Sequence, residues 1–114
     1  KKIIKIVHLE IRKKLNKFLK KNISKKIVIL DIPLLLENKI NKKNDILIFI
    51  QSKKSDISQR LRKRENFNPK LLSTFKNIQL PPDYKKKRSQ FIIKNDYTKK
   101  SVKVAVRKII KEIL

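Results

Sequence analysis

Three short apolar runs limit what this lysine-rich chain can fold into, and they lie at residues 27–30, 46–50 and 91–93. Each run is rich in β-branched residues and stops within a few positions at a polar or proline-containing segment, as buried strands do. Continuous apolar strands separated by crossovers favour parallel pairing with both faces covered. The sequence therefore predicts an α/β protein in three layers, with helices on both faces of a short sheet.

An amphipathic helix is expected at residues 2–21, where apolar residues recur with helical spacing and lysines fill the other faces. Its apolar face consists of Ile4, Val7, Ile11, Leu15 and Phe18. We expect this face to pack on another element. After the first predicted strand, Pro33 opens a short helical or turn segment that continues to Glu37.

Helix-capping residues precede each of the later helical segments. The expected starts are Ser55 for a helix that ends near Arg64, Asn68-Pro69 for the next, Pro81-Pro82 for a short helix through Arg88, and Thr98 or Ser101 for the last. The apolar positions expected to face inward include Ile57, Leu61, Leu71, Leu72, Phe75, Ile78, Val102, Val106, Ile109, Ile110 and Ile113.

The net charge of the chain predicts only a broad class of binding partners. Lys and Arg number 33 against 9 Asp and Glu, which gives a formal net charge of +24 over 114 residues. Such a charge attracts phosphate-bearing partners of any kind, from nucleotides to nucleic acid or anionic lipid. Lysine is spread over every predicted helix and marks no single patch, so the charge does not choose among these partners.

Several residue types are absent from this chain or rare in it, and their absence excludes some kinds of binding site. The chain has no cysteine, which excludes disulfides and thiolate metal sites, and its single histidine argues against a His-rich metal centre. Its apolar runs are far shorter than the roughly 20 residues of a membrane span, and no signal-peptide centre is visible. We expect one soluble, cytoplasmic domain at residues 1–114.

The absence of glycine is the sharpest of these exclusions. A chain with no glycine cannot form a Gly-rich loop that cradles phosphate. The chain also has no methionine, so we expect it to be processed or to be part of something longer.

An acidic residue follows the first predicted strand. Asp31 lies at the carboxyl end of that strand, where ligands collect in α/β sheets, and a carboxylate there can reach a magnesium ion or its water. A cap or turn role for Asp31 is the alternative. Pro33 stiffens the chain beyond it, and Glu37 adds a second acid near the same strand end.

Two further pairs of side chains are spaced for binding phosphate. Arg60 and Arg64 are four residues apart in a predicted helix, so their guanidinium groups could bracket a polyphosphate; a solvated helix face is the alternative. His8 and Arg12 are one helical turn apart and could grip a phosphate or hydroxyl group together, or could be structural.

In order along the chain, these segments resemble the dephospho-CoA kinase family, which uses ATP to phosphorylate the ribose 3′-hydroxyl of dephospho-CoA. The most specific match is "DIPLLLE" in the stretch "VILDIPLLLE" at residues 28–37. The other matches are His8 and Arg12 in "IVHLEIRKKL", "RLRKR" at residues 60–64, Gln79 in "NIQLP", Lys85, and "FIIKN" ending at Asn95.

The resemblance implies a P-loop NTPase fold of the nucleoside and nucleotide kinase type. Such a fold has a parallel sheet flanked by helices, a helical substrate region and a mobile lid, here at about residues 66–90, and this chain would form an incomplete version of it. The substrates implied are ATP and dephospho-CoA, with Mg²⁺ as cofactor. By this resemblance, Asp31 would be the catalytic residue that reaches Mg²⁺ through a bound water. The residues on the dephospho-CoA side would be His8, Arg12 and Glu37. Arg60 and Arg64 would lie at the ATP phosphates, and Asn95 would lie beside the adenine.

The chain departs from the family pattern in two ways. The Walker A loop and the early aspartate expected to act as base are not in these residues, and Leu9 replaces the proline that usually follows the histidine. Positioning and electrostatics supply nearly all phosphoryl-transfer catalysis, so we expect the chain alone to be inactive. A sheet lacking its first strand would also leave an exposed edge, which predicts marginal stability or self-association.

Two alternatives remain at the level of sequence. One is a small basic nucleic-acid-binding protein, for instance ribosome-associated, whose charge contacts phosphates without catalysis. The low aromatic content, the lack of a Gly-containing RNA motif and the acids of "DIPLLLE" argue against it. The other is a truncated chain that serves as a non-catalytic partner. Oligomeric state is open.

Overall fold

The computed structural model describes residues 2–114, except for the side chain of Phe75. The expected inward position of Phe75 therefore lies outside what is described. The chain divides into two compact units, Lys1–Ile40 and Asn41–Leu114. None of the helices within residues 2–114 is both long enough and apolar enough to cross a membrane.

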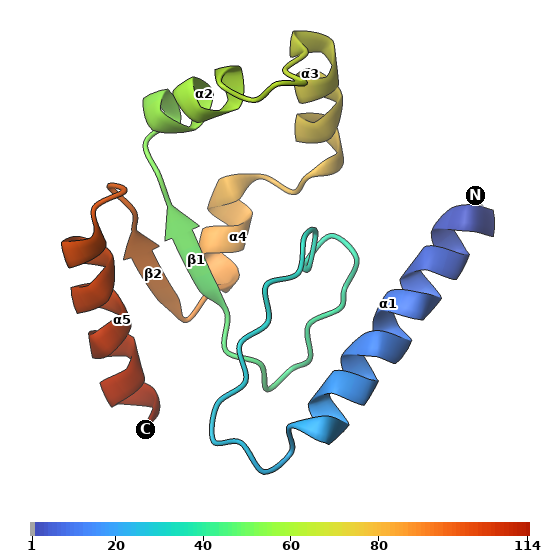
Figure 1. The fold of residues 1–114 in the computed structure, drawn as a ribbon, viewed down its shortest axis with the longest axis vertical. Coiled ribbons are helices and arrows are strands. Elements are labelled where there is room, and N and C mark those ends of the chain that lie inside the picture. Colours follow the sequence, from blue (N-terminus) through green and yellow to red (C-terminus); the bar gives the residue numbers. More distant parts are fainter. Residues whose placement is uncertain (1) are drawn as a thin grey trace. The chain divides into compact units, whose positions relative to one another are not determined.

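The first unit begins with helix α1 (Lys2–Lys21), which has the bounds that the apolar spacing predicts (Figure 1). The helix is followed by Asn22, whose backbone N–H and side-chain amide both donate to the carbonyl oxygen of Phe18, at 3.1 and 2.9 Å. No described residue of α1 is buried, and Ile4 and Phe18 are about half exposed. The expected packing of its apolar face is therefore not observed.

The predicted strand at residues 27–30 is wrong. These residues belong to no strand, and Ile29 has 85% of its surface exposed. A strand is held by hydrogen bonds to a neighbouring strand, and the sheet within residues 2–114 consists of two other segments. An apolar β-branched run is suited to a sheet, but it cannot form one without a partner.

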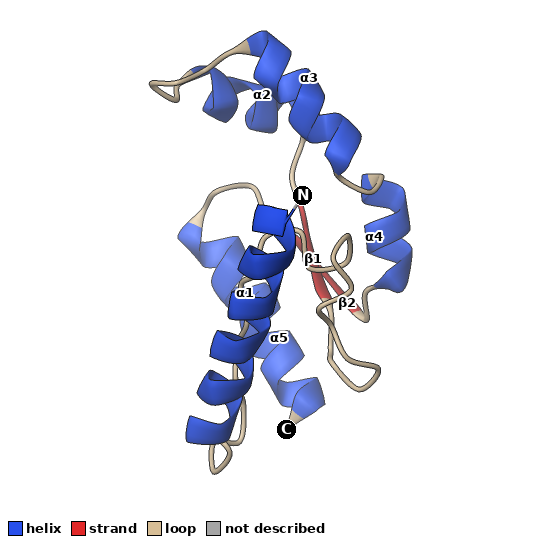
Figure 2. Ribbon diagram, turned by 90° about the vertical axis from the view of Figure 1, so that its right-hand side faces the viewer, coloured by secondary structure: helices blue, strands red, loops and turns tan. Residues whose placement is uncertain are grey.

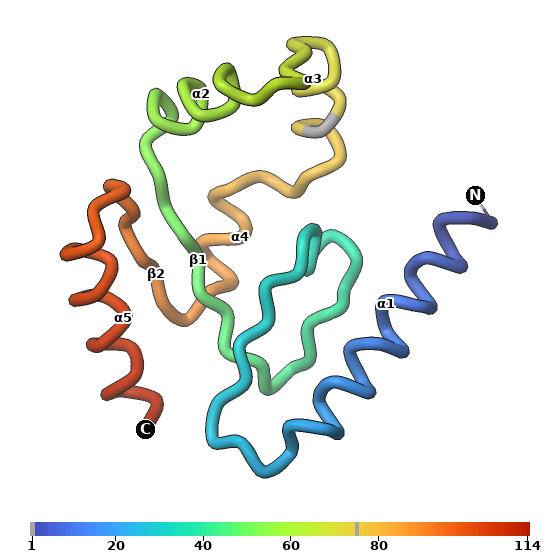
Figure 3. Tube along the Cα trace, in the orientation of Figure 1, coloured from blue at the N-terminus to red at the C-terminus, as the bar shows by residue number. Residues whose placement is uncertain are grey.

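The expected turn segment does follow Pro33, and it occupies residues 33–39 (Figure 3). The backbone N–H groups of Asn38 and Ile40 donate to the carbonyl oxygens of Leu34 and Leu35, both at 3.0 Å. Leu34 and Lys39 adopt positive φ angles of 56° and 51°. Glycine usually takes such left-handed positions, so a chain without glycine must place other residues there.

The second unit is built around two parallel strands, β1 (Ile48–Gln51) and β2 (Phe91–Lys94), with Ile48 opposite Phe91. Three helices lie between them in the sequence: α2 (Lys54–Arg62), α3 (Pro69–Ile78) and α4 (Pro82–Arg88). Helix α5 (Lys99–Ile113) follows β2 and packs on it, and α4 lies on the other side of the strands (Figure 2). The α/β class is confirmed, with two of the three predicted strands.

The core of the second unit lies where α5 meets β2. Ile93 and Ile109 are both buried there. Side chains along β2 alternate between its two faces, so Ile92 next to Ile93 is 43% exposed. This contact fixes the carboxyl end of β2 and the turn that leads into α5.

Only some of the expected caps are formed. The Asn68 Oδ1 atom accepts a hydrogen bond from the Lys70 N–H at 2.9 Å, and Pro69 takes the first helical position, as predicted. The Ser55 cap is wrong, because α2 already begins at Lys54. Helix α2 also ends at Arg62, so Arg64 lies just beyond it rather than on its last turn.

Candidate functional site

The candidate site lies at the carboxyl ends of β1 and β2. Because the strands are parallel, both ends meet at one edge of the sheet, the place where α/β proteins bind ligands. The Asn95 N–H donates to the Gln51 carbonyl oxygen at 2.7 Å and extends the strand pairing by one residue. The segments leaving the sheet are therefore held side by side, with Ser52 on one and Asn95 to Thr98 on the other.

The turn after β2 is fixed by two consecutive polar side chains. The Asn95 Oδ1 atom accepts a hydrogen bond from the Tyr97 N–H at 2.8 Å. The Asp96 Oδ1 atom accepts from the Thr98 N–H at 2.9 Å, from the Thr98 hydroxyl at 2.7 Å, and from the Ser101 hydroxyl. The hydrogen bond from Ser101, with those from Thr98, lowers the pKa of Asp96 to about 2. The carboxylate therefore stays ionised and anchors the start of α5.

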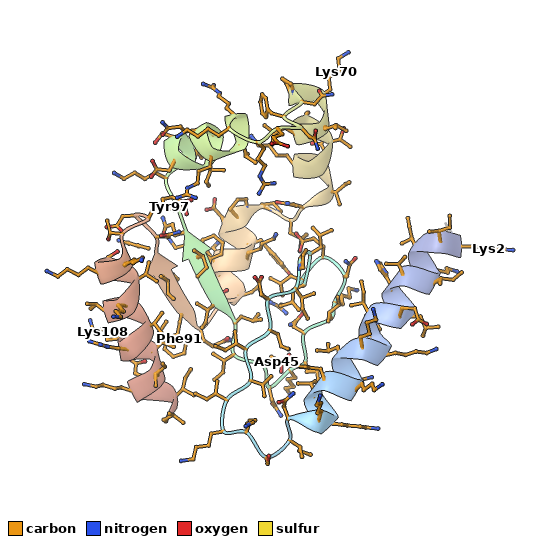
Figure 4. All side chains as sticks on the ribbon, in the orientation of Figure 1. Lys2, Asp45, Lys70, Phe91, Tyr97 and Lys108 are labelled. Atoms are coloured by element: carbon orange, nitrogen blue, oxygen red, sulfur yellow. The ribbon has the colours of Figure 1, made fainter. Side chains whose placement is uncertain are left out.

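Tyr97 connects the turn after β2 to the residue that follows β1 and to helix α2. Its φ angle is 63°, in the left-handed region. Its hydroxyl donates to the Ser52 Oγ atom at 3.2 Å. The guanidinium carbon of Arg60 lies 3.5 Å from the centre of the ring, a close cation–π contact. Figure 4 shows Tyr97 at the end of the strands, close to where α2 begins.

A pocket of about 580 Å³ opens beside this stack. Its lining includes three cationic side chains, Arg60, Lys63 and Arg64, which come from the end of α2 and the turn after it. The remaining lining residues are Asp56, Gln59, Asp96 and Tyr97. Guanidinium groups bind phosphate through several donors at once, so this set of side chains can hold a polyphosphate.

A second hollow of about 490 Å³ lies against α5 and is also lined by Tyr97. Asn95 and Tyr97 line it together with Val102 and Val106 of α5. The remaining lining residues are Thr98, Lys99, Lys103 and Arg107. Tyr97 therefore borders both cavities. The valines give the second hollow an apolar wall, and basic side chains line both cavities, so together they suit a ligand with a flat base and phosphates.

The three predicted site residues of the second unit thus surround Tyr97. Arg60 and Arg64 line the cationic pocket, although Arg64 reaches it from the turn after α2, and Asn95 lines the adjoining hollow. Sequence reasoning missed Lys63, Asp96 and Tyr97. Asn95 and Asp96 directly after a predicted strand were a usable signal, because both residue types form tight turns with their own backbone.

The four predicted site residues of the first unit lie on two segments. His8 and Arg12 are one turn apart on α1, and the Arg12 Nη2 atom donates to the Asn38 carbonyl oxygen at 3.1 Å. This bond joins α1 to the turn that contains the half-buried Glu37. Asp31 is exposed and lies just before the turn at residues 33–39, in a segment that forms no strand.

The described residues suit only an indirect contact with Mg²⁺, through a water bound to the metal. Within residues 2–114 no three His, Cys, Asp or Glu side chains come together in a way that could hold a metal ion. Magnesium in phosphate sites usually keeps several waters and binds one or two carboxylates plus the phosphates of the substrate. The single exposed carboxylate of Asp31 suits contact through a metal-bound water and does not form a metal site alone.

Parallel strands with a cationic pocket at their carboxyl edge are typical of α/β proteins that bind phosphate-bearing ligands. The comparison with known families is more specific. The dephospho-CoA kinase family profile matches residues 1–101, so the chain belongs to the dephospho-CoA kinase family.

Curated relatives agree with this assignment. One is a dephospho-CoA kinase of Wolbachia sp. subsp. Brugia malayi (strain TRS), 34% identical over 107 residues, which cover 92% of this chain and 54% of the relative. Another, from Bacillus thuringiensis subsp. konkukian (strain 97-27), is 32% identical over 112 residues, which cover 95% of this chain and 55% of the relative. The chain spans about half the length of the curated relatives it matches.

Proposed function

We propose that the whole protein transfers the γ-phosphoryl group of ATP to the ribose 3′-hydroxyl of dephospho-CoA, which gives CoA. Membership of the dephospho-CoA kinase family supports the reaction. The observation that carries the proposal is the pocket of Arg60, Lys63 and Arg64 at the carboxyl edge of the parallel sheet. These cationic side chains outnumber the two carboxylates in the lining, Asp56 and Asp96, and their position suits the phosphates of ATP.

The second unit would bind ATP in an incomplete P-loop fold. Arg60 and Arg64 would hold the phosphates through planar, multi-donor groups, and Lys63 would add a third positive charge. Asn95 would lie beside the adenine, in keeping with its place in the second hollow. Residues 66–90, which contain α3 and α4, would form the lid.

The first unit would serve the other substrate. His8, Arg12 and Glu37 would bind dephospho-CoA, and the bond from Arg12 to Asn38 supports this by joining α1 to the segment of Glu37. Asp31 would be the catalytic residue that reaches Mg²⁺ through water. Bound Mg²⁺ would offset the charge that develops on the transferred phosphoryl group.

We further propose that these 114 residues do not catalyse the reaction alone. Phosphoryl transfer depends on the precise holding of the phosphates, and a glycine-free chain has no Gly-rich loop to surround them. Their binding residues would still recognise ATP. Phosphorylation of dephospho-CoA by the purified 114-residue chain would contradict this proposal.

Binding of MgATP and of dephospho-CoA, measured by calorimetry over a series of salt concentrations, tests the assignment. Arg64→Gln should weaken MgATP binding about tenfold, because a charge-assisted hydrogen bond contributes about 1.5 kcal/mol. Arg88→Gln is the matched control, since Arg88 does not line the pocket. Equal effects of both substitutions would refute the assignment of the pocket. Tight, steeply salt-dependent binding of a DNA duplex, with no response to dephospho-CoA, would instead favour a nucleic-acid-binding protein.

A further inference from the structure

Tyr97 has a backbone conformation that an aromatic residue rarely adopts. Its φ angle is 63°, in the left-handed region that glycine, asparagine and aspartate enter most readily. A bulky residue is retained there when the surrounding structure fixes it, and such outliers cluster at functional sites. The presence of an aromatic side chain at position 97 therefore needs an explanation.

The turn around Tyr97 is tightly held from both sides. Asn95 accepts the backbone N–H of Tyr97 itself, and Asp96 collects three hydrogen bonds from Thr98 and Ser101. These hydrogen bonds lower the pKa of Asp96 to about 2, so the anchor stays ionised even in mild acid. The backbone thus fixes the direction in which the side chain of Tyr97 leaves the turn.

The ring of Tyr97 contacts two elements outside its own turn. Its hydroxyl reaches Ser52, directly after β1, at 3.2 Å, and its face lies 3.5 Å from the guanidinium carbon of Arg60 on α2. Stacking occupies only the face of a guanidinium group, so its N–H donors in the plane remain available for phosphate. Arg60 can therefore be held by the ring and bind an anion at the same time.

We propose that Tyr97 is a positioning residue that holds the Arg60 guanidinium group over its ring, in the orientation that binds phosphate. The inference rests on the proposed function, because it assigns the cationic pocket to the phosphates of ATP. A long arginine side chain loses rotamer freedom when it binds a ligand, and stacking removes part of that freedom beforehand. Tyr97 thus acts on phosphate through Arg60.

The chain contains a matched control for this contact. Tyr84 and Arg88 form a second arginine–tyrosine pair on α4, at 5.8 Å, and neither residue lines the cationic pocket. Tyr84→Asn removes a ring of the same kind outside the site. Tyr97→Asn removes the ring at the site and keeps a residue that tolerates a positive φ. Tyr97→Phe keeps the ring and removes the hydroxyl.

The first experiment is NMR of the free 114-residue chain. A guanidinium group above an aromatic face is shielded by the ring, so the Arg60 side-chain protons should shift upfield in the wild type and in Tyr97→Phe. They should return to ordinary positions in Tyr97→Asn and stay shifted in Tyr84→Asn. Arg60 signals at ordinary positions in the wild type would overturn the proposal without any variant or ligand.

The second experiment is titration with inorganic triphosphate. Tyr97→Asn should weaken binding about three- to fivefold, the size of a partly exposed cation–π contact. Tyr97→Phe should restore most of the affinity, and Tyr84→Asn should match the wild type. In an Arg60→Gln background, Tyr97→Asn should have no further effect.

A merely structural Tyr97 gives a different result. Tyr97→Asn would then weaken triphosphate binding equally with and without Arg60, and this outcome would overturn the proposal. A wild-type chain that binds neither triphosphate nor MgATP would instead overturn the proposed function. The Arg60 signals would still decide whether Tyr97 holds the guanidinium group.

Discussion

The substitution Ile93→Ala should strongly destabilise the second unit. Ile93 is 6% exposed and lies where β2 meets α5. Truncation to alanine removes three buried carbons, at about 0.8 kcal/mol each, and leaves a cavity on top of that loss. The expected loss in the free energy of unfolding is about 3 kcal/mol, a large fraction of the 5–15 kcal/mol of an ordinary domain.

Ile92→Ala provides the matched control for this change. Ile92 is the preceding residue of the same strand but is 43% exposed, so the same truncation should cost about 1 kcal/mol. Urea unfolding followed by far-UV circular dichroism measures the loss of stability in both variants. With a slope of about 1.5 kcal/mol per molar urea, the midpoint should fall by about 2 M for Ile93→Ala and by less than 1 M for Ile92→Ala. Equal shifts would refute the assignment of the core to this face of β2.

Three further predictions concern the turns and caps. Asp96→Asn should lower stability above about pH 4, and the difference should vanish as the pH falls to about 2. The pKa of Asp96 is lowered from 3.8 to about 2 in the fold, so its contribution is lost as the carboxylate is protonated, and denaturation curves from pH 2 to 7 measure it. Asn68→Ala should cost about 1 kcal/mol in chemical denaturation by removing the α3 cap, whereas Ser73→Ala in the same helix should cost little. Lys39→Gly should raise the free energy of unfolding by up to about 1 kcal/mol by relieving a positive φ, which a higher thermal midpoint would show, and a similar rise for Lys43→Gly would contradict this reason.

Local sequence signals predicted the helices of this chain well. The bounds of α1 follow from the spacing of its apolar residues, and the start of α3 follows from the Asn68 cap and Pro69. Both signals act within one or two turns of the chain, so they are present in the sequence itself. The run at residues 27–30 is different, because a strand depends on hydrogen bonds to a distant partner.

In the candidate site, too, residues with a local sequence signal could be predicted, and residues that depend on distant contacts could not. Arg60 and Arg64 could be singled out because arginine is scarce here and because their spacing suits one ligand. Tyr97 could not, since its importance depends on Arg60, which is far from it in sequence, and on a φ angle that no side-chain pattern reveals. The signature around Asp31 predicted the family, which the family match confirms, whereas Asp31 itself is exposed and belongs to no helix or strand.

The parallel pairing of β1 and β2 also has a consequence for the rate at which the second unit folds. The side chain of Gln90 accepts a hydrogen bond from the Leu47 N–H across 43 positions of sequence, and the sheet cannot form until that span closes. Closing a loop of this length costs about 3 kcal/mol of chain entropy, whereas α2, α3 and α4 within it need only local contacts. The helices should therefore form early and the sheet late. Since the cationic pocket needs both α2 and the turn after β2, binding of triphosphate should report the last step of folding.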